Sequence, residues 1–306
     1  MGAGVRAEAP RRKPKQERRW DLLWFVGPAL LIYGLYTVYP IFSTLYYSLF
    51  QWSGISENKA FVGLANYAAL LADAVFWRTL GNNLILVFAS VFTQIPLGLV
   101  MALLLFAPIR GIRLLRTVYF LPMLMSTVAL GILWTYIYDP TTGVLNGFLA
   151  GIGLERWQRA WLGEPATAFA SVIATIAWQF APFYMILLRA AIIGIPAEIY
   201  ESARIDGCSG WNRFRRITLP LILPTIITSA VLSVIGSLKY FDLIYVMTEG
   251  GPGHSTELMA TNMYKQAFVQ FNMGYASTIA VAMFAIAFIA AAAILATDRS
   301  RRGAAS

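Results

Sequence analysis

The side chains that could do chemistry concentrate in one polar segment, residues 196–220, which lies between two long apolar stretches. Pro196 is placed to begin a helix, and Glu198 and Glu201 fall in its first turns, where the helix dipole favours acidic side chains. Gly207 then permits the sharp change of direction that ends a helix. A charged helix that stops at a glycine offers contacts to another macromolecule, so the segment is typical of a docking element.

A second helix is expected to follow the turn. Ile199, Tyr200 and Ala203 recur near helical spacing and would give the first helix one face for packing. Residues 211–217 form another amphipathic stretch, and residues 219–220 lead into the next apolar run. The segment therefore predicts a short helix, a tight turn and a second helix that project from a membrane. An ordinary amphipathic loop at the membrane surface would carry similar charges and stays open as an alternative.

The rest of the sequence gives little evidence for a catalytic site or a metal site. Cys208 is the only cysteine and His254 the only histidine, so neither a multi-histidine metal site nor an intrachain disulfide can form. A phosphate-binding loop would need a Gly-Lys pair, and the chain has none. A serine–histidine–aspartate triad would depend on a single loop histidine. We therefore expect a protein that is not an enzyme and that holds no metal or cofactor of its own.

Composition places the chain in a membrane. Hydrophobic residues make up 58% of the sequence and charged residues 13%, whereas about a quarter of a soluble domain is charged. A helix needs about 20 apolar residues to cross a bilayer, and lipid offers no partners for bare backbone groups. The sequence predicts an all-α membrane protein with six transmembrane helices, at residues 22–49, 82–106, 117–138, 166–188, 221–247 and 273–296.

The basic residues orient these spans. Most of the 24 lysines and arginines flank the spans on the side that holds both termini, and positive charge marks the cytoplasmic side. We therefore expect a multi-pass protein of the cytoplasmic (inner) membrane with both termini in the cytoplasm. Basic tails, residues 1–18 and 299–306, would flank a single membrane domain, residues 19–298, with its core at about 78–296. Because the charges flank spans, nucleic-acid binding is not expected.

The polar segment also carries a spaced pattern: Glu-x-Ala, three residues, Gly, nine residues and Ile-x-Leu-Pro. It resembles the EAA loop of the permease subunits of binding-protein-dependent ABC importers, although Ser202 replaces the middle alanine. In that family the loop is the coupling helix, which fits a cleft on the ATPase subunit. The resemblance assigns coupling to the ATPase to Glu201, Ser202, Ala203, Asp206 and Gly207.

Two further stretches narrow the resemblance. Residues 61–67, followed by 76–78 and by Asn82 and Asn83, resemble the segment after the first span in carbohydrate-type permeases. Residues 241–252 resemble the end of the fifth span in the same group, in particular the first of the two permeases in maltose- and glycerol-3-phosphate-type importers. The large periplasmic insertion of the maltose permease is missing.

This resemblance implies a type I ABC importer transmembrane domain that translocates a sugar or related polar solute. The partners it implies are a second homologous permease, two copies of a cytoplasmic ABC ATPase and an extracytoplasmic solute-binding protein. ATP and Mg would be bound by the ATPase. A stand-alone secondary transporter is the alternative, but such carriers usually show inverted repeats, and this sequence has no convincing one.

Polar residues inside the spans are candidates for the solute path, since they are costly in a membrane and often functional. Aromatic faces with amide or carboxylate groups commonly hold sugars, so the candidates are Gln94, Trp178, Gln179, Tyr240 and Asp242. Structural roles compete with this interpretation. Gln94 and Gln179 could join helices, and Asp242 could pair with Lys239, three residues away on one helix.

Overall fold

The computed structural model describes residues 19–106 and 111–303, and the predictions for residues 1–18 and residues 304–306 lie outside this range. The described chain divides into two compact units, one ending at Tyr46 and the other beginning at Tyr47. Five of its helices are long and apolar enough to cross a membrane, or six if one bent pair counts as a span. The prediction of an all-α membrane protein with six spans is therefore confirmed in its main features.

The first unit is one helical stretch. Helices α1 (Arg19–Tyr33) and α2 (Tyr39–Tyr47) are joined by a π-helical turn, Gly34–Val38. Residues 26–47 of this stretch qualify as a span, in place of the predicted 22–49.

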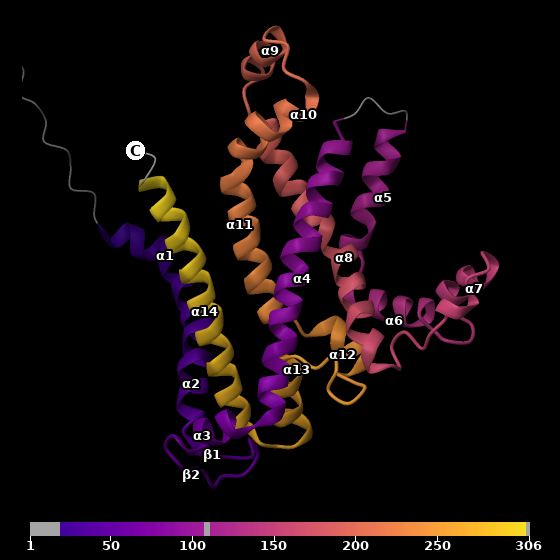
Figure 1. Cartoon of the computed structure of the whole chain (residues 1–306). Coiled ribbons are helices and arrows are strands. Elements are labelled where there is room, and N and C mark those ends of the chain that lie inside the picture. The colour runs from indigo at the N-terminus through magenta and orange to yellow at the C-terminus, as the bar shows by residue number, and fades with distance from the viewer. Residues whose placement is uncertain (1–18, 107–110, 304–306) are drawn as a thin grey trace, which may run out of the picture. The chain divides into compact units, whose positions relative to one another are not determined.

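The second unit holds the other spans. Helix α4 (Ala74–Leu104) packs against α8 (Pro165–Ile193) and α11 (Leu219–Leu238), and α11 also packs against α14 (Met273–Gly303) (Figure 1). The shorter elements are β1 (Phe50–Gln51) paired antiparallel with β2 (Ala60–Phe61), α3 (Ala65–Ala72), α7 (Val144–Gly151), a 3-10 turn (Glu155–Trp157), α13 (Met259–Tyr264) and a π-helical turn (Lys265–Val269).

The third span is broken. Helix α5 (Ile112–Leu124) is followed by α6 (Thr127–Ile137), and the two are bent by 106°. Met125, at the break, has an extended backbone. Helix α6 packs against α12 (Asp242–Thr248), and Gly131 makes this possible, since a Cβ atom there would lie 2.7 Å from Val246. The prediction of one continuous helix at residues 117–138 is wrong.

The fifth span ends earlier than predicted. Helix α11 stops at Leu238, and α12 begins only at Asp242, whereas the prediction ran to residue 247. Asn83 on α4 explains the stop, because its Nδ2 donates to the carbonyl oxygens of Ser237 (3.1 Å) and Leu238 (3.3 Å). A continuing helix would use these carbonyls for its own hydrogen bonds. Lys239 and Asp242 are therefore not on one helix, which removes the reason to expect them to pair.

A tight turn follows α6. The Oδ1 atom of Asp139 accepts hydrogen bonds from the N–H and hydroxyl groups of Thr141 and Thr142. These bonds lower the pKa of Asp139 to about 2, the Thr142 N–H contributing most. A carboxylate with a lowered pKa loses its stabilising effect only as pH falls toward that value. The turn therefore persists in mild acid.

The crossing of α4 and α8 depends on Gly98. A Cβ atom at this position would lie 2.8 Å from the backbone nitrogen of Met185 and 2.8 Å from the Cβ of Tyr184. Overpacking of this kind costs about 1–3 kcal/mol, so we expect Gly98→Ala to lower the melting temperature in detergent by about 4–8 °C. Gly81→Ala on the same helix is the control, because its Cβ would meet nothing within 4 Å. Equal melting temperatures for the two variants would contradict this packing.

Candidate functional site

The polar segment folds into a short helix with a fixed end. Helix α9 (Ala197–Ile205) begins after Pro196, as predicted. Gly207 has φ +71°, and the N–H of Cys208 donates to the Ala203 carbonyl at 2.9 Å. The N–H of Gly207 donates to the Arg204 carbonyl at 3.1 Å. This pair of bonds around a left-handed residue is a Schellman motif, so the predicted turn at Gly207 is confirmed.

One face of α9 packs against the helix that follows it. Ala203 is buried, and the Tyr200 hydroxyl lies 3.0 Å from the Thr218 hydroxyl. The Arg213 guanidinium lies over the Tyr200 ring at 5.9 Å. Ile199 was expected on this face, but it is 38% exposed, and that expectation is wrong.

The opposite face of α9 is open. Of the five residues predicted to couple to an ATPase, Glu201, Ser202, Asp206 and Gly207 are exposed, while Ala203 supports the helix from inside. Ile205 is 86% exposed, an apolar side chain on a charged helix. The face therefore combines acidic and apolar groups that a partner could cover.

The second helix of the segment is not separate. Residues 210–238 form one helix, made of α10 (Gly210–Arg213), a π-helical turn (Phe214–Thr218) and α11. The prediction of a second projecting helix at residues 211–217 is wrong in this respect. A short turn therefore connects α9 directly to a helix that continues into the bundle. A displacement of α9 would act on the whole of α11.

A cavity of about 230 Å³ lies among α4, α8 and α11. Gln94 and Tyr240, both predicted, line it together with Phe180, Ser233 and Ser237. None of its lining residues is charged. The cavity thus offers amide and hydroxyl groups beside aromatic rings.

Hydrogen bonds position the two polar candidates. The Tyr240 hydroxyl donates to Gln179 Oε1 at 3.3 Å, and Gln179 Nε2 donates to Thr127 Oγ1 at 3.3 Å. Gln94 Nε2 donates to Ser90 Oγ at 3.1 Å. Two successive hydrogen bonds thus link Thr127 of α6 to Gln179 of α8 and Gln179 to Tyr240. They hold the Tyr240 ring at the cavity wall.

Gln179 contacts Tyr240 but does not line the cavity, and the structure does not bring Trp178 or Asp242 to it. Trp178 is 39% exposed and packs edge-on against Trp134, with ring centroids 5.4 Å apart. It lines a separate groove with Thr93 and Pro182. Asp242 is exposed at the start of α12.

Ser233 and Ser237 were not among the candidates predicted from the sequence, although their spacing carried a signal. Ser229, Ser233 and Ser237 recur every four residues on α11, so they share one helix face, and all three are buried.

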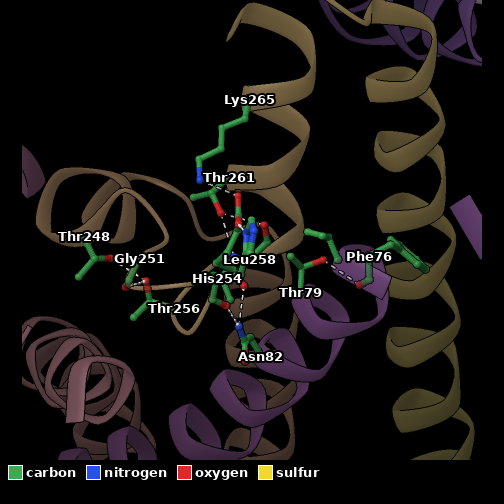
Figure 2. A network of polar contacts seen from close by, with 12 residues as sticks. Phe76, Thr79, Asn82, Thr248, Gly251, His254, Thr256, Leu258, Thr261 and Lys265 are labelled. Atoms are coloured by element: carbon green, nitrogen blue, oxygen red, sulfur yellow. Dashed lines mark hydrogen bonds and ion pairs between the residues drawn. The ribbon is translucent and has the colours of Figure 1, made fainter. Parts of the chain in front are cut away.

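A second polar cluster is drawn in Figure 2. It includes the loop that leads into α13, which lies at the other end of the helices from α9 (Figure 1). The Glu257 side chain is 1% exposed, and Lys265 Nζ lies 2.8 Å from its Oε1. His254 Nδ1 contacts Oε2 of the same carboxylate. Asn82 Nδ2 donates to the carbonyl oxygens of Glu257 (2.8 Å) and His254 (3.1 Å). Asn83 Oδ1 accepts from the Met259 N–H at 2.9 Å, so α4 holds this loop from two adjacent residues.

Comparisons with known proteins agree with this architecture. Residues 94–303 match the family described as binding-protein-dependent transport system inner membrane component. A probable ABC transporter permease of Pyrococcus horikoshii is 37% identical over 88% of this chain and 92% of its own length. The trehalose/maltose transport system permease of Thermococcus litoralis is 33% identical over 90% and 92%. The diacetylchitobiose uptake permease of Streptomyces coelicolor is 33% identical over 96% and 86%.

A solved structure shows the same fold. A chain of a bacterial ABC transporter that imports alginate superposes with a TM-score of 0.81, at 23% identity, over 93% of this chain and 96% of its own.

Proposed function

Because the chain belongs to the family of inner membrane components of binding-protein-dependent transport systems, we propose that it is the permease subunit through which an ABC importer moves a neutral sugar. The chain is a multi-pass transport component rather than an enzyme. We assign ATP hydrolysis to a separate cytoplasmic ATPase, present in two copies, which binds ATP and Mg. A second homologous permease and an extracytoplasmic solute-binding protein complete the proposed assembly.

The geometry of α9 is the observation that carries this proposal. The helix has an exposed face, a fixed turn at Gly207 and a direct connection to α11. Arg189, Arg204 and Arg213 lie at this end of the bundle, and basic residues favour the cytoplasmic side. ATP binding would close the ATPase pair and move α9 as a rigid lever, so that the spans change from inward-open to outward-open. The binding protein would then release its solute into the path.

The proposed cargo rests on the cavity and on the relatives. Relatives carry the names of trehalose/maltose and diacetylchitobiose systems. Gln94, Ser233, Ser237 and Tyr240 could exchange hydrogen bonds with sugar hydroxyls, and Phe180 could cover an apolar sugar face. An ionised cargo would find no counter-charge in the cavity wall.

Tyr240→Phe should weaken transport by raising the KM of uptake about five-fold, because it removes one hydroxyl hydrogen bond worth about 1 kcal/mol. Gln94→Leu should act in the same direction. The control is Phe92→Leu, a residue of α4 that is 70% exposed. If the melting temperature falls while KM stays unchanged, these side chains only join helices and the cavity assignment is wrong.

The assembly is tested by purifying a tagged chain with the products of its neighbouring genes and identifying the copurifying proteins by mass spectrometry. We expect an ATPase and a second permease. Glu201→Ala and Gly207→Val should lose the ATPase and keep the second permease. Recovery of this chain alone, in a stable form, would instead favour a stand-alone carrier.

A further inference from the structure

A second cavity, of about 570 Å³, lies beneath α9 and is separate from the sugar cavity. Its roof is formed by Tyr200 and Arg204 of α9, and one side by Arg213 and Thr218 of the helix that follows. The facing wall consists of apolar residues from the ends of α4 and α8, including Leu103 and Ile192. The cleft thus has a cationic side next to α9 and an apolar side next to the spans.

The two arginines have no acidic partner within the part of the chain that the structure describes. The acidic residues of this region, Glu198, Glu201 and Asp206, are exposed, and none of them lines the cleft. Arg213 contacts the Tyr200 ring, which fixes its guanidinium without neutralising it. The cleft therefore carries two positive charges that a bound anion could neutralise.

We propose that this cleft binds one phospholipid with an anionic headgroup. The inference rests on the proposed cytoplasmic position of α9, since the cytoplasmic leaflet carries the anionic lipids that basic pockets between transmembrane helices bind. Arginine forms paired hydrogen bonds with phosphate, and the Tyr200 and Thr218 hydroxyls lie beside the same space. The apolar wall distinguishes a lipid from free phosphate, because a phosphate ion alone would leave the exposed side chains of Phe106 and Ile193 uncovered. A bound lipid would connect α9 to the ends of α4 and α8.

The test measures lipid retention on the assembled transporter by native mass spectrometry. The purified complex in detergent is titrated with phosphatidylglycerol or with phosphatidylcholine, without nucleotide. We expect one phosphatidylglycerol to be retained in preference to phosphatidylcholine. Each basic side chain near an anionic lipid contributes about five-fold in affinity, so Arg204→Gln/Arg213→Gln should weaken retention about 25-fold.

Two variants keep the result interpretable. Arg215→Gln/Arg216→Gln removes the same amount of charge from the helix that carries Arg213, but neither residue lines the cleft, so we expect less than about a two-fold loss. Arg204→Gln alone keeps the Arg213–Tyr200 contact and should still lose about five-fold, even if the double variant is poorly folded.

Several results would overturn the proposal. Equal loss in the two double variants would mean diffuse attraction between basic residues and lipid. Full competition by inorganic phosphate would identify a phosphate site. Unchanged lipid retention, with weaker ATPase binding in Arg204→Gln, would assign the arginine to the partner interface. Because lipid retention needs neither ATP nor cargo and can be repeated on the chain alone, its failure is distinguishable from a failure of the importer assignment.

Discussion

Gly207→Val is expected to leave the protein in the membrane but to lower ATP-driven uptake by on the order of ten-fold or more. Gly207 has φ +71°, a conformation that costs an L-residue about 1–2 kcal/mol and a β-branched one more. A Cβ atom there would meet nothing within 4 Å, so the effect is conformational and not a clash. Loss of the left-handed turn breaks the hydrogen bonds from Gly207 and Cys208 that end α9. Uptake and solute-stimulated ATP hydrolysis, measured together in proteoliposomes, check the result.

Two other substitutions isolate the cause. Gly207→Asn should retain most of the coupling, because asparagine tolerates the left-handed conformation. Gly210→Ala adds a methyl group to the same segment without a positive φ or a close neighbour, and it should transport normally. Full uptake with normally stimulated ATPase in Gly207→Val would refute a coupling role for this turn.

Glu257→Gln is expected to destabilise the protein by breaking a buried ion pair. The Glu257 carboxylate is buried and neutralises Lys265, whose side chain is 29% exposed. Removing one partner of a buried pair costs about 3–5 kcal/mol, and the partial exposure of Lys265 reduces this to about 2 kcal/mol. The melting temperature of the detergent-solubilised protein should fall by about 4–8 °C.

A double-mutant cycle tests the explanation. Glu257→Gln/Lys265→Gln removes both charges and should recover part of the lost stability. His254→Gln should cost less than Glu257→Gln, since the His254 side chain is 48% exposed. If the double variant is as unstable as the sum of the two single variants, the ion pair is not what holds this loop.

The helix and turn at residues 197–207 could largely be predicted from the sequence, because their signals are local. Proline, acidic residues and glycine occupy positions in one short segment that dictate where a helix starts and stops, and α9 begins and ends there. The length of the following helix could not be predicted. No local signal shows that the amphipathic stretch at residues 211–217 and the apolar α11 form one continuous helix.

The early end of the fifth span and the fold of the loop after it could not be predicted, because the residues that hold them lie far away in the sequence. The stop at Leu238 depends on Asn83, which is 155 residues away, and Glu257 is held by Asn82, 175 residues away. Apolar composition alone does not distinguish a continuous helix from a broken one.

The residues predicted to contact the solute could likewise be identified only in part from the sequence. Gln94 and Tyr240 meet at one cavity, whereas Trp178 belongs to the opposite face of α8. A list of polar residues within spans identifies candidates but not the face on which each lies, and the four-residue spacing of Ser229, Ser233 and Ser237 was the available guide to the cavity wall.

Chemical cross-linking tests whether α9 lies against the ATPase, as a coupling helix must. In a Cys208→Ser background, which removes the only cysteine, the exposed Ser202 is replaced by cysteine and the assembled complex is treated with a thiol–amine cross-linker. Exposed Glu155→Cys, in the loop after α7, is the control. We predict an ATPase adduct from position 202 and none from position 155. An intact complex that gives no ATPase adduct from position 202, or equal adducts from both positions, would rule out docking of α9 on the ATPase.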